Sequence, residues 1–386
     1  MGKRAVLSEA RLRYERFKEF FKLRQCYRAN RAREDCDRSR VGLGLDLLTW
    51  FFSYRTLPVH YGRCRIWELD KSEWKYYFGS NYRPLHEARL KKLVWPAEYR
   101  VLFDDKFVCG LLCQALGINI PRTYGVLDPS GDYRTQLAAW LAESPGRRLI
   151  IKPLCGQSGR DIVLAEEGGE GIAIRSKHSQ FTLDQFILKE SAIAQEVVTQ
   201  HSAMAALSSA SVNTLRVVTM MTRGGEVIIV NAALRTGVGS AFVDNWAAGG
   251  VAIGVNCETG RLRAIAYDKK GRRYAVHPTS GIAFADFPVP SWERIRATAV
   301  AIQKAFPFYR MLGLDLAVEP NGEPVLIEIN YAPDFTFLEQ TGGPVLKIDP
   351  VLRAFGEYDL LVNKHQRKLY HALGRPRSHQ AKGSQP

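Results

Sequence analysis

The sequence lacks the signatures of several protein classes. Its seven cysteines include no pair with CxxC spacing, which argues against a thiolate zinc site and predicts reduced thiols. The longest apolar run, residues 41–52, is interrupted by Asp46 and is too short to span a bilayer. The basic N-terminus has no apolar signal core, so we do not expect secretion. With 46% hydrophobic and 24% charged residues, the composition is ordinary for a soluble globular protein, and the reduced thiols predict a cytoplasmic location.

Acidic residues are scarce at both ends of the chain. Residues 1–40 contain 13 Lys and Arg against 6 Asp and Glu, and residues 363–386 contain 6 Lys and Arg and no acid. These two ends carry most of the net charge of +15. Basic ends predict an anionic surface nearby, which would be membrane lipid, nucleic acid or an acidic polymer. A solvated helix and a disordered tail would account for the same charge.

The N-terminal quarter of the sequence predicts helices. Residues 8–40 have the pattern of a long amphipathic helix in which phenylalanines stand among arginines, and Gly42 and Gly44 are expected to end it. Such a helix would either lie on a membrane or pack on its own domain. Residues 45–95 are rich in Trp, Tyr and Phe, and we expect them to be helical and packed.

From residue 96 the pattern changes to a mixture of strands and helices. Asp104 and Asp105 precede Lys106 and predict the N-terminus of a helix, where acidic side chains are favourable. The C-terminal tail is rich in Gly, Pro, Ser, Gln and Lys and is expected to be disordered. We expect helices over 104–116, 133–142 and 292–306, and strands over 123–127, 149–152, 162–164, 192–198, 213–222, 227–234 and 251–255.

Residues 312–330 predict a hairpin of two strands joined by a tight turn at Asn321-Gly322. With a two-residue loop, Asp315 falls directly opposite Glu328, and one face of the hairpin is wholly apolar. The other face carries Asp315, Glu328 and Asn330. Two prolines flank the turn, and either one would be able to shift this register by a residue.

The polar face of this hairpin predicts a metal site. Two carboxylates directly across a ladder repel each other, so they need a cation between them. Three oxygen ligands without Cys or His suit a hard cation. Asp315, Glu328 and Asn330 are therefore candidate ligands of Mg2+. The alternative is a surface hairpin whose polar face is simply solvated.

A candidate anion-binding loop follows a buried strand. Lys152 ends an apolar run and precedes the loop Gly156-Gln157-Ser158-Gly159. The backbone N–H groups of a small, Gly-rich loop approach an anion closely, and the neighbouring lysine supplies a point charge. The loop is not a Walker A motif, because no Gly-Lys-Ser/Thr follows it. An ordinary turn is the alternative.

Polar groups also stand at three later positions. Glu196, Val197 and Val198 end a strand before a polar stretch, a junction at which backbone groups could meet a purine edge and the carboxylate a ribose. Arg216 lies within a β-branched strand and Arg235 at a strand end. Each arginine needs an anionic partner, which is either a ligand or a structural carboxylate. The polar segment 244–250 is of a kind that closes over ligands.

Taken in chain order, these motifs resemble the ATP-grasp superfamily. The order is Asp-Lys at a helix start, Ile-Ile-Lys-Pro with a Gly-Gln-Ser-Gly loop, Gln-Glu-Val-Val, Asn-Thr-Leu-Arg, and an Asp followed by Glu-Ile-Asn. The Asn-Thr-Leu-Arg segment at 213–216 resembles the branch called sugar-transfer associated ATP-grasp proteins. The resemblance covers about residues 96–350. It implies an α+β ATP-grasp fold in which two lobes sandwich ATP, preceded by an N-terminal helical extension.

The resemblance also implies cofactors and the residues that bind them. ATP and Mg2+ are the expected cofactors. By this resemblance Lys106 and Lys152 would bind the phosphates under the loop Gly156-Gln157-Ser158-Gly159. Glu196 would bind the ribose, and the backbone of Val197 and Val198 would contact the adenine. Asp315, Glu328 and Asn330 would bind Mg2+, and Arg216 and Arg235 would contact the γ-phosphate or an acyl phosphate.

The implied organisation has four regions: a basic, aromatic-rich helical region at 1–95, a pre-ATP-grasp segment with the small lobe at 96–198, the large lobe with the Mg2+ site at 199–355, and a basic tail at 356–386. Many members of the superfamily carry a distinct substrate-binding domain before the ATP site. Here that region is basic, aromatic and helical, so the identity of the acceptor does not follow from the resemblance.

The implied activity is ADP-forming ligation of a carboxylate to an amine or another nucleophile through an acyl phosphate, in glycan or peptide modification such as polysaccharide biosynthesis. The alternatives are a phosphotransferase on the same fold and a non-enzymatic basic protein that binds nucleic acid or membrane. Expected partners are the carboxylate and amine substrates, together with an anionic membrane that contacts the N-terminal helix. Nucleic acid is not expected.

Overall fold

The structure is a computed structural model in which the chain divides into two compact units. The terminal unit consists of Met1–Arg89 and Pro344–Pro386, and the central unit consists of Leu90–Gly343. In the described part of the chain, no helix combines the length and apolarity that crossing a membrane requires. The described residues are 14, 17–54, 57–58, 60–79, 90, 92–156, 161–169, 171–177, 179–239, 249–361 and 363–374.

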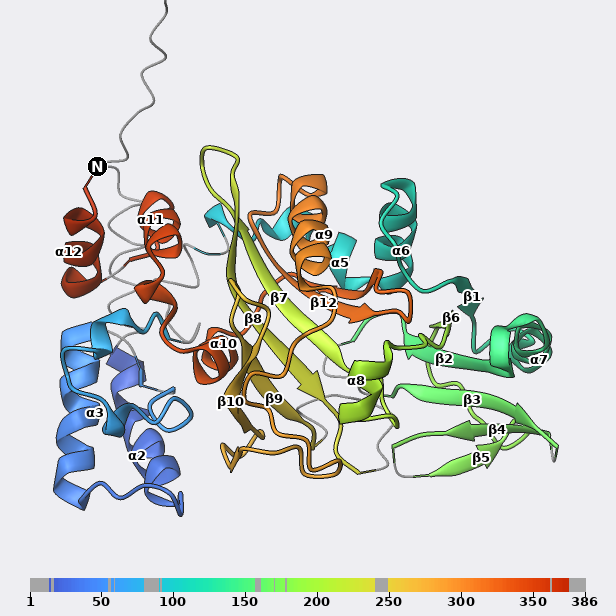
Figure 1. The fold of residues 1–386 in the computed structure, drawn as a ribbon, viewed down its shortest axis with the longest axis horizontal. Helices are drawn as coiled ribbons and strands as arrows, with labels where there is room; N and C mark the ends of the chain where they lie inside the picture. Colours follow the sequence, from blue (N-terminus) through green and yellow to red (C-terminus); the bar gives the residue numbers. More distant parts are fainter. Residues whose placement is uncertain are drawn as a thin grey trace, which may run out of the picture. The chain divides into compact units, whose positions relative to one another are not determined.

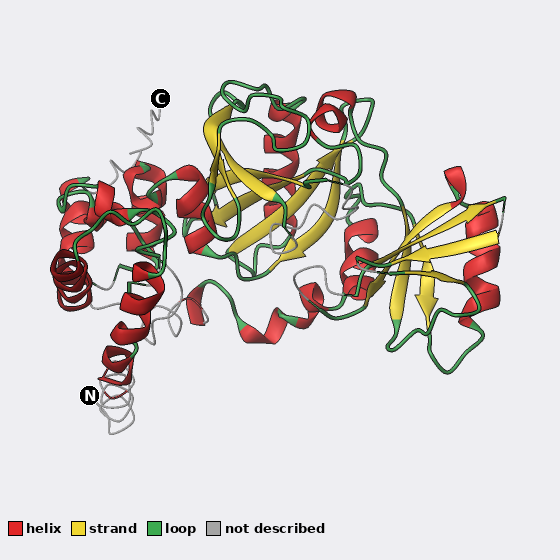
Figure 2. Ribbon diagram, turned by 90° about the horizontal axis from the view of Figure 1, so that it is seen from below, coloured by secondary structure: helices red, strands yellow, loops and turns green. Residues whose placement is uncertain are grey.

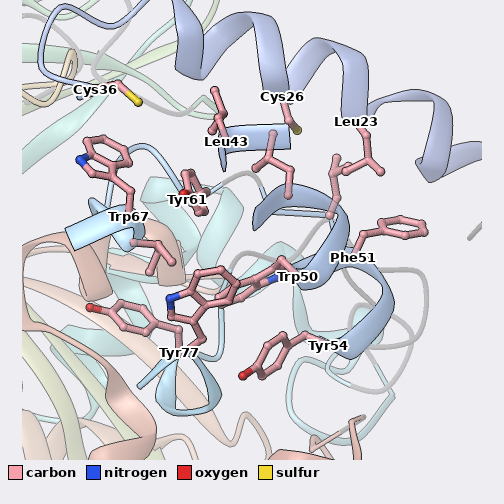
Figure 3. Close-up of a cluster of buried hydrophobic side chains, with 14 residues drawn as sticks. Leu23, Cys26, Cys36, Leu43, Trp50, Phe51, Tyr54, Tyr61, Trp67 and Tyr77 are labelled. Carbon is pink, nitrogen blue, oxygen red and sulfur yellow. The ribbon is translucent and has the colours of Figure 1, made fainter. Parts of the chain in front are cut away.

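The terminal unit is built from short helices around an aromatic core. Trp50 is fully buried and stacks on Tyr54, with the ring centroids 4.6 Å apart, within the cluster of buried side chains drawn in Figure 3. Large rings bury the most apolar area per residue, so this cluster holds the short elements together. Its helices with bounds in the described residues, shown in Figure 1, include α2 (Leu23–Arg31), α3 (Arg40–Tyr54), α11 (Asp349–Glu357) and α12 (Lys364–Ala372), and 3-10 turns lie at Ile66–Glu68, Trp74–Tyr76 and Val345–Lys347.

The structure corrects the predicted helix over residues 8–40. Helix α2 ends at Arg31, and α3 contains Gly42 and Gly44 in its first turns instead of being preceded by them. The N–H of Gly42 donates to Ser39 Oγ (3.0 Å) at the start of α3. Burial along α3 outweighs a helix-propensity cost of about 1 kcal/mol for each glycine. The buried residues that recur at helical spacing are Leu43, Leu47, Trp50 and Tyr54.

Two further predictions for the terminal unit are corrected. Among the described residues of 45–95, α3 ends at Tyr54, residues 57–58 and 60–79 form mainly turns and 3-10 turns around the same core, and Leu90, Lys92 and Leu93 are again helical. The C-terminal tail, which was expected to be disordered, contains α12. Asn363 caps this helix, and Gln366 donates from Nε2 to the carbonyl oxygen of Tyr77 (2.9 Å). Residues 375–386 lie outside the described residues.

The central unit contains two antiparallel sheets, which Figure 2 shows in yellow. The first sheet, with helix α7 (Tyr133–Glu143), is here called the small lobe. Its strand order is β1-β6-β2-β3-β4-β5, and α7 packs on it through the buried side chains of Leu137 and Leu141. The strands are β1 (Thr123–Leu127), β2 (Arg148–Pro153), β3 (Val163–Gly168), β4 (Gly171–Arg175), β5 (Gln180–Thr182) and β6 (Ala192–Glu196).

The second sheet, with helices α9 (Trp292–Ala305) and α10 (Phe335–Gly342), is here called the large lobe. Its strand order is β11-β10-β9-β8-β7-β12-β13. Thr219 of β7 donates to Gln303 of α9 (2.9 Å), so the side chain of Arg216, three residues earlier, lies on the opposite face of the sheet. The strands are β7 (Thr214–Met221), β8 (Val227–Thr236), β9 (Val251–Val255), β10 (Leu262–Tyr267), β11 (Arg273–Tyr274), β12 (Met311–Val318) and β13 (Pro324–Asn330).

Most elements predicted for the central unit are confirmed. The predicted helices at 104–116, 133–142 and 292–306 correspond to α6 (Lys106–Ala115), α7 and α9, and every predicted strand has a counterpart. The predicted strand at 192–198 is two residues too long, because β6 ends at Glu196. Among the described residues, the elements that the sequence pattern does not predict are β4, β5, β10, β11, α5 (Val101–Asp104), α8 (Ser202–Leu207), α10 and the 3-10 turns Ala97–Tyr99 and Pro145–Arg147.

The hairpin β12–β13 pairs Asp315 with Glu328, as predicted. The predicted two-residue loop is wrong, however, because the turn is longer. Strand pairing stops at Val318 and Pro324, so the register near the turn is offset by one residue from the predicted register. Proline cannot donate a ladder hydrogen bond, and Pro324 accordingly stands at the very start of its strand.

A β-bulge then corrects the offset. Leu316 pairs with Leu326 and Asp315 pairs with Glu328, so Ile327 is the extra residue of the bulged strand. The longer turn and the bulge shift the register in opposite directions and cancel. Asp315 and Glu328 therefore share one face of the sheet, although the apolar face does not follow the simple predicted alternation.

Candidate active site

Asp315 is the most enclosed member of the predicted metal site, with a side chain that is 2% exposed compared with 36% for Glu328. Strand β7 lies beside β12 and places Arg216 directly opposite Asp315. Arg216 donates from Nε to Oδ1 and from Nη2 to Oδ2 (3.0 Å). Arg235, on β8, brings Nη2 to 2.9 Å from the same Oδ2. Asp315 is thus held between two guanidinium groups.

These contacts identify the anionic partner of both arginines. The sequence leaves open a ligand or a structural carboxylate, and the structure pairs Arg216 and Arg235 with Asp315. Thr214 Oγ1 accepts hydrogen bonds from Nε (3.1 Å) and Nη2 (2.7 Å) of Arg235. Sequence reasoning missed this role of Thr214. The available signal was its place two residues before Arg216, which puts both side chains on one face of the strand.

Glu328 faces Asp315 across the ladder but has weaker compensation. In the described part of the chain its ion-pair partner is Lys106, with Nζ 4.0 Å from Oε1. Burial raises the pKa of Glu328, and the charge of Asp315 raises it further, against the opposing charges of Lys106, Arg216 and Lys152. The pKa of Glu328 therefore lies above its usual value, which means that the carboxylate would be stabilised by an additional cation.

The opposite holds for Asp315. Burial alone would raise the pKa of its carboxyl group, but the charges of Arg216 and Arg235, with hydrogen bonds from Arg216 and Asn330, hold the pKa below its usual value. Asn330 donates from Nδ2 to Asp315 Oδ2 (3.2 Å), which leaves the side-chain carbonyl oxygen of Asn330 as a possible ligand atom. The negative charge of Asp315 is thus fully compensated by its neighbours, whereas that of Glu328, its partner across the ladder, is not.

The two predicted phosphate-binding lysines come from different elements. Asp105 caps α6, so Lys106 is the first residue of the helix, and its backbone N–H donates to the carbonyl oxygen of Leu154 beyond the end of β2 (3.0 Å). Its Nζ donates to the carbonyl oxygen of Gly156 (3.1 Å). These contacts place the start of α6 against the segment that follows Lys152. Gln157, Ser158 and Gly159 lie outside the described residues.

Lys152 lies on β2, and its Nζ donates to Oε1 of Gln195 on β6 (3.1 Å). Gln195 in turn donates from Nε2 to Thr123 Oγ1 (3.0 Å). This buried amide positions the lysine, a role that the sequence pattern does not reveal. Because the charge of Lys152 also acts on Glu328, both lysines belong to the same charged cluster as the hairpin carboxylates.

The predicted adenosine-binding residues lie at the end of β6. Glu196 ends the strand, and its N–H donates to the carbonyl oxygen of Arg122 (2.9 Å). Val197 and Val198 follow it and are half-buried. Within the described residues Glu196 forms no ion pair with either lysine. Of the segment 244–250, only Gly249 and Gly250 lie within the described residues.

The ligand atoms at the hairpin fit a Mg2+ ion. All three candidate side chains present oxygen, which Mg2+ prefers, and burial together with the charge of Asp315 raises the pKa of Glu328, an effect that a bound cation would oppose. No group of three or more His, Cys, Asp and Glu residues suited to a metal occurs in the described parts of the chain, so Asn330 is required as the third ligand. Asp315 would have to exchange an arginine contact for the ion.

Comparison with known proteins identifies the family of the chain. The family model described as sugar-transfer associated ATP-grasp matches residues 85–355, a range that contains the whole central unit. It confirms the fold predicted from the motif order. No curated protein matches the sequence.

Solved structures with a similar fold have low sequence identity to this chain. An N5-carboxyaminoimidazole ribonucleotide synthetase in complex with ADP is 12% identical over 60% of this chain and 45% of its own, with a TM-score of 0.36. The D-Ala:D-Ser ligase VanG from Enterococcus faecalis is 17% identical over 66% and 61%, with a TM-score of 0.39. A D-cycloserine synthetase is 13% identical over 81% and 94%, also with a TM-score of 0.39. The chain spans less than two thirds of the length of the first two proteins.

Proposed function

The chain belongs to the sugar-transfer associated ATP-grasp family, and we propose that it is an ADP-forming ligase that joins a carboxylate to an amine or another nucleophile. The observation that supports this proposal is the gathering of two lysines, two arginines, two carboxylates and an amide where α6 and β2 meet the hairpin β12–β13. Positive groups fixed in this way neutralise the charge that develops during phosphoryl transfer.

ATP is the proposed phosphoryl donor. In this proposal Lys106 and Lys152 bind its phosphates, because they come from separate elements and share one charged cluster. The loop that begins at Gly156 covers the phosphates. Glu196 binds the ribose, and the backbone of Val197 and Val198 contacts the adenine, which accounts for a carboxylate placed where β6 ends.

Mg2+ is the proposed metal cofactor, held by Asp315, Glu328 and Asn330. When bound, the ion would supply positive charge to the phosphates during transfer. Glu328 is the ligand that gains most, because its own surroundings leave it under-compensated. Asp315 is also the anchor of both arginines, so it links the proposed metal site to the groups that contact the substrate.

Arg216 and Arg235 are the proposed catalytic cations. A substrate carboxylate oxygen attacks the γ-phosphorus, the bond to the β-phosphate oxygen breaks, and ADP leaves with that electron pair. The acyl phosphate is then attacked at its carbonyl carbon by the nucleophile, and phosphate leaves. Arg216 stabilises the γ-phosphate and then the acyl phosphate, and Arg235 assists it. Both would give up part of their contact with Asp315 to do so.

The proposed substrates are a carboxylate and an amine on a glycan precursor or a peptide. This class rests on the family's description as sugar-transfer associated and on the basic ends of the chain, which suit an acidic polymer. We accordingly propose that the protein acts in polysaccharide biosynthesis.

Trapping with hydroxylamine tests the reaction type. The full chain is incubated with ATP, Mg2+, hydroxylamine and a panel of sugar acids, amino acids and peptides, and both ADP and hydroxamate are measured. We expect ADP and hydroxamate in equal amounts for at least one acid. The variant Glu328→Gln should abolish both, whereas Glu323→Gln, a charge loss at the exposed turn of the same hairpin, should retain both. ADP with a stable phosphorylated product and no hydroxamate would identify a phosphotransferase instead.

A further inference from the structure

The exposed face of helix α3 is apolar. Val41 and Phe52 are 73% and 61% exposed, and Leu45 and Leu48 between them are also exposed. Their spacing of four, three and four residues places all four on one side of the helix. The opposite side faces the aromatic core of the terminal unit. A helix of a globular protein normally covers its outer side with polar residues, and α3 does not.

Three phenylalanines extend this apolar surface. Phe20 lies with its ring centroid 6.1 Å from that of Phe52 and 5.7 Å from that of Phe51. Phe17 packs against Phe21 at 5.2 Å, and Phe21 is 66% exposed. Figure 3 shows Phe51 at the side of the core cluster, with Leu23 on the neighbouring helix. Phe17, Phe20, Phe21, Val41, Leu45, Leu48 and Phe52 are together called the apolar patch.

A contiguous patch of this kind calls for a partner. Single exposed apolar residues are common on globular proteins, but a contiguous group of seven, rich in aromatic rings, is typical of an interaction surface. Val276 and Ile187 of the central unit are also exposed, but they lie far apart in the sequence and on no common helix.

Basic residues of α2 continue the helical face that carries Phe17 and Phe21. Phe17, Phe21, Arg24, Arg28 and Arg31 recur at spacings of four, three, four and three residues, which places apolar and basic side chains on one stripe. Arg24, Arg28 and Arg31 are exposed and form no ion pair within the described parts of the chain. Residues 17–40 contain eight basic and four acidic residues.

Two of the four acids in this segment are paired with cations. Glu19 pairs with Lys22. Asp35 accepts a hydrogen bond from Arg33 (2.8 Å) and a second one from Arg65. The remaining two, Glu34 and Asp37, are exposed and lie between α2 and α3. The field around the apolar patch is therefore positive, and it matches an anionic surface.

We propose that the apolar patch and the Arg24, Arg28 and Arg31 stripe dock the terminal unit on an anionic lipid bilayer. The phenylalanines and the α3 side chains would enter the region between headgroups and acyl chains, and the arginines would meet lipid phosphates. A second copy is a poorer match, because a two-fold contact through this face would bring the arginines of both copies together. This inference goes beyond the proposed ligase activity and does not depend on it.

Vesicle flotation of the full chain tests the proposal. The probes are vesicles of phosphatidylcholine alone and of phosphatidylcholine mixed with phosphatidylglycerol. The wild type should float with the anionic vesicles, and its affinity should fall steeply with salt. The double variant Leu45→Gln/Phe52→Gln should bind at least about tenfold more weakly, because less apolar area enters the bilayer. Arg24→Gln/Arg28→Gln should also bind more weakly to anionic vesicles.

A matched control separates this patch from general hydrophobicity. The variant Ile187→Gln/Val276→Gln replaces two exposed apolar residues of the central unit and should bind like the wild type. Circular dichroism establishes that each variant is folded. Equal binding by the patch variant and the control would overturn the proposal. So would a wild-type dimer in light scattering that Leu45→Gln/Phe52→Gln converts to a monomer without any vesicle binding, since the occupant would then be a second copy.

Discussion

Two buried aspartates, one in each unit, show how similar local chemistry supports different roles. Asp46 of the terminal unit accepts hydrogen bonds at Oδ2 from Arg38 Nε and from the hydroxyl of Tyr61, both at 2.8 Å. Lys71 Nζ lies 3.2 Å from Oδ1. Asp315 of the central unit is likewise bound by two cations and an uncharged donor.

The surroundings of the two aspartates differ. The cations that reach Asp46 are largely exposed, whereas Arg216 and Arg235 beside Asp315 are half-buried. Asp315 also faces Glu328, a second carboxylate whose pKa is raised by burial and by Asp315 itself. Asp46 is therefore a fully paired structural anchor, whereas the Asp315 cluster includes a second carboxylate, Glu328, that is under-compensated. Such imbalance is what separates a ligand site from an internal salt bridge.

The largest effect is expected at the structural aspartate. Asp46→Asn removes the charge that both cations meet and weakens the acceptor of the buried Tyr61 hydroxyl, so we expect α3 to lose about 2 kcal/mol of stability. Hydrogen exchange of α3 peptides measures this loss. Asp37→Asn, at an exposed aspartate in the same unit, should change the stability of α3 measured by hydrogen exchange by less than about 0.5 kcal/mol. Equal protection in both variants would contradict the structural role of Asp46.

The same contrast has a pH dependence. Burial tends to raise the pKa of Asp46, but hydrogen bonds from Arg38, Tyr61 and Lys71 more than offset burial and lower the pKa. A carboxyl group whose pKa is lower in the folded state than in the unfolded state stabilises the protein fully when the pH is above the unfolded-state pKa. This stabilisation is lost as the pH falls through the folded-state pKa. The difference between wild type and Asp46→Asn should thus be constant above the ordinary value of 3.8 and shrink below it. A difference that grows on acidification would refute the assignment.

A smaller stability loss is expected at the site aspartate. In Asp315→Asn the guanidinium groups lose their main partner, but Glu328 stands across the ladder and is relieved of the repulsion from Asp315. We expect strand β12 to lose less than about 1 kcal/mol, under half of the loss at Asp46. Hydrogen exchange of β12 peptides measures this loss, so that it can be compared with the loss in α3 caused by Asp46→Asn. A loss as large as that of Asp46→Asn would mean that Glu328 does not compensate the arginines.

The smallest effect concerns the glycines of α3. A Cβ added at Gly44 meets no atom within 4 Å, whereas a Cβ at Gly42 would lie 2.9 Å from Ser39 Oγ. Gly44→Ala should therefore stabilise the terminal unit by about 0.7 kcal/mol through helix propensity. Gly42→Ala should bring no gain, because it disturbs the Ser39 contact. Thermal unfolding, followed by the helical circular dichroism signal, compares the two variants. Equal shifts of the unfolding temperature would rule out this account of the contact between Gly42 and Ser39.

Local patterning was sufficient to predict much of the central unit and part of its site. Strand and helix periodicity located α6, α7 and α9, and alternation placed Asp315, Glu328 and Asn330 on one face. The pairing of Asp315 with Glu328 was nevertheless predicted from a loop that is too short. It survived because the bulge at Ile327 reversed the error. Bulges depend on packing against the rest of the sheet, which a local pattern does not contain.

Contacts between distant segments were beyond the sequence pattern. Arg216 and Asp315 are neighbours because β7 pairs with β12, and Thr214 meets Arg235 because β7 also pairs with β8. A single sequence states that an arginine in a strand needs an anion, but not which anion is beside it. The same limit explains Gly42 and Gly44, where burial of the core face of α3 overrides the helix-breaking tendency of glycine.

The central claim is that the hairpin β12–β13 forms a metal-dependent nucleotide site. Calorimetric titration of the full chain with ATP tests it most directly, in Mg2+ and in EDTA, for wild type, Glu328→Gln and the control Glu323→Gln. We predict that wild type and Glu323→Gln bind ATP alike and only with Mg2+, and that Glu328→Gln binds at least about tenfold more weakly, a loss of about 1.4 kcal/mol. ATP binding that is independent of Mg2+ and unchanged in Glu328→Gln would contradict the claim.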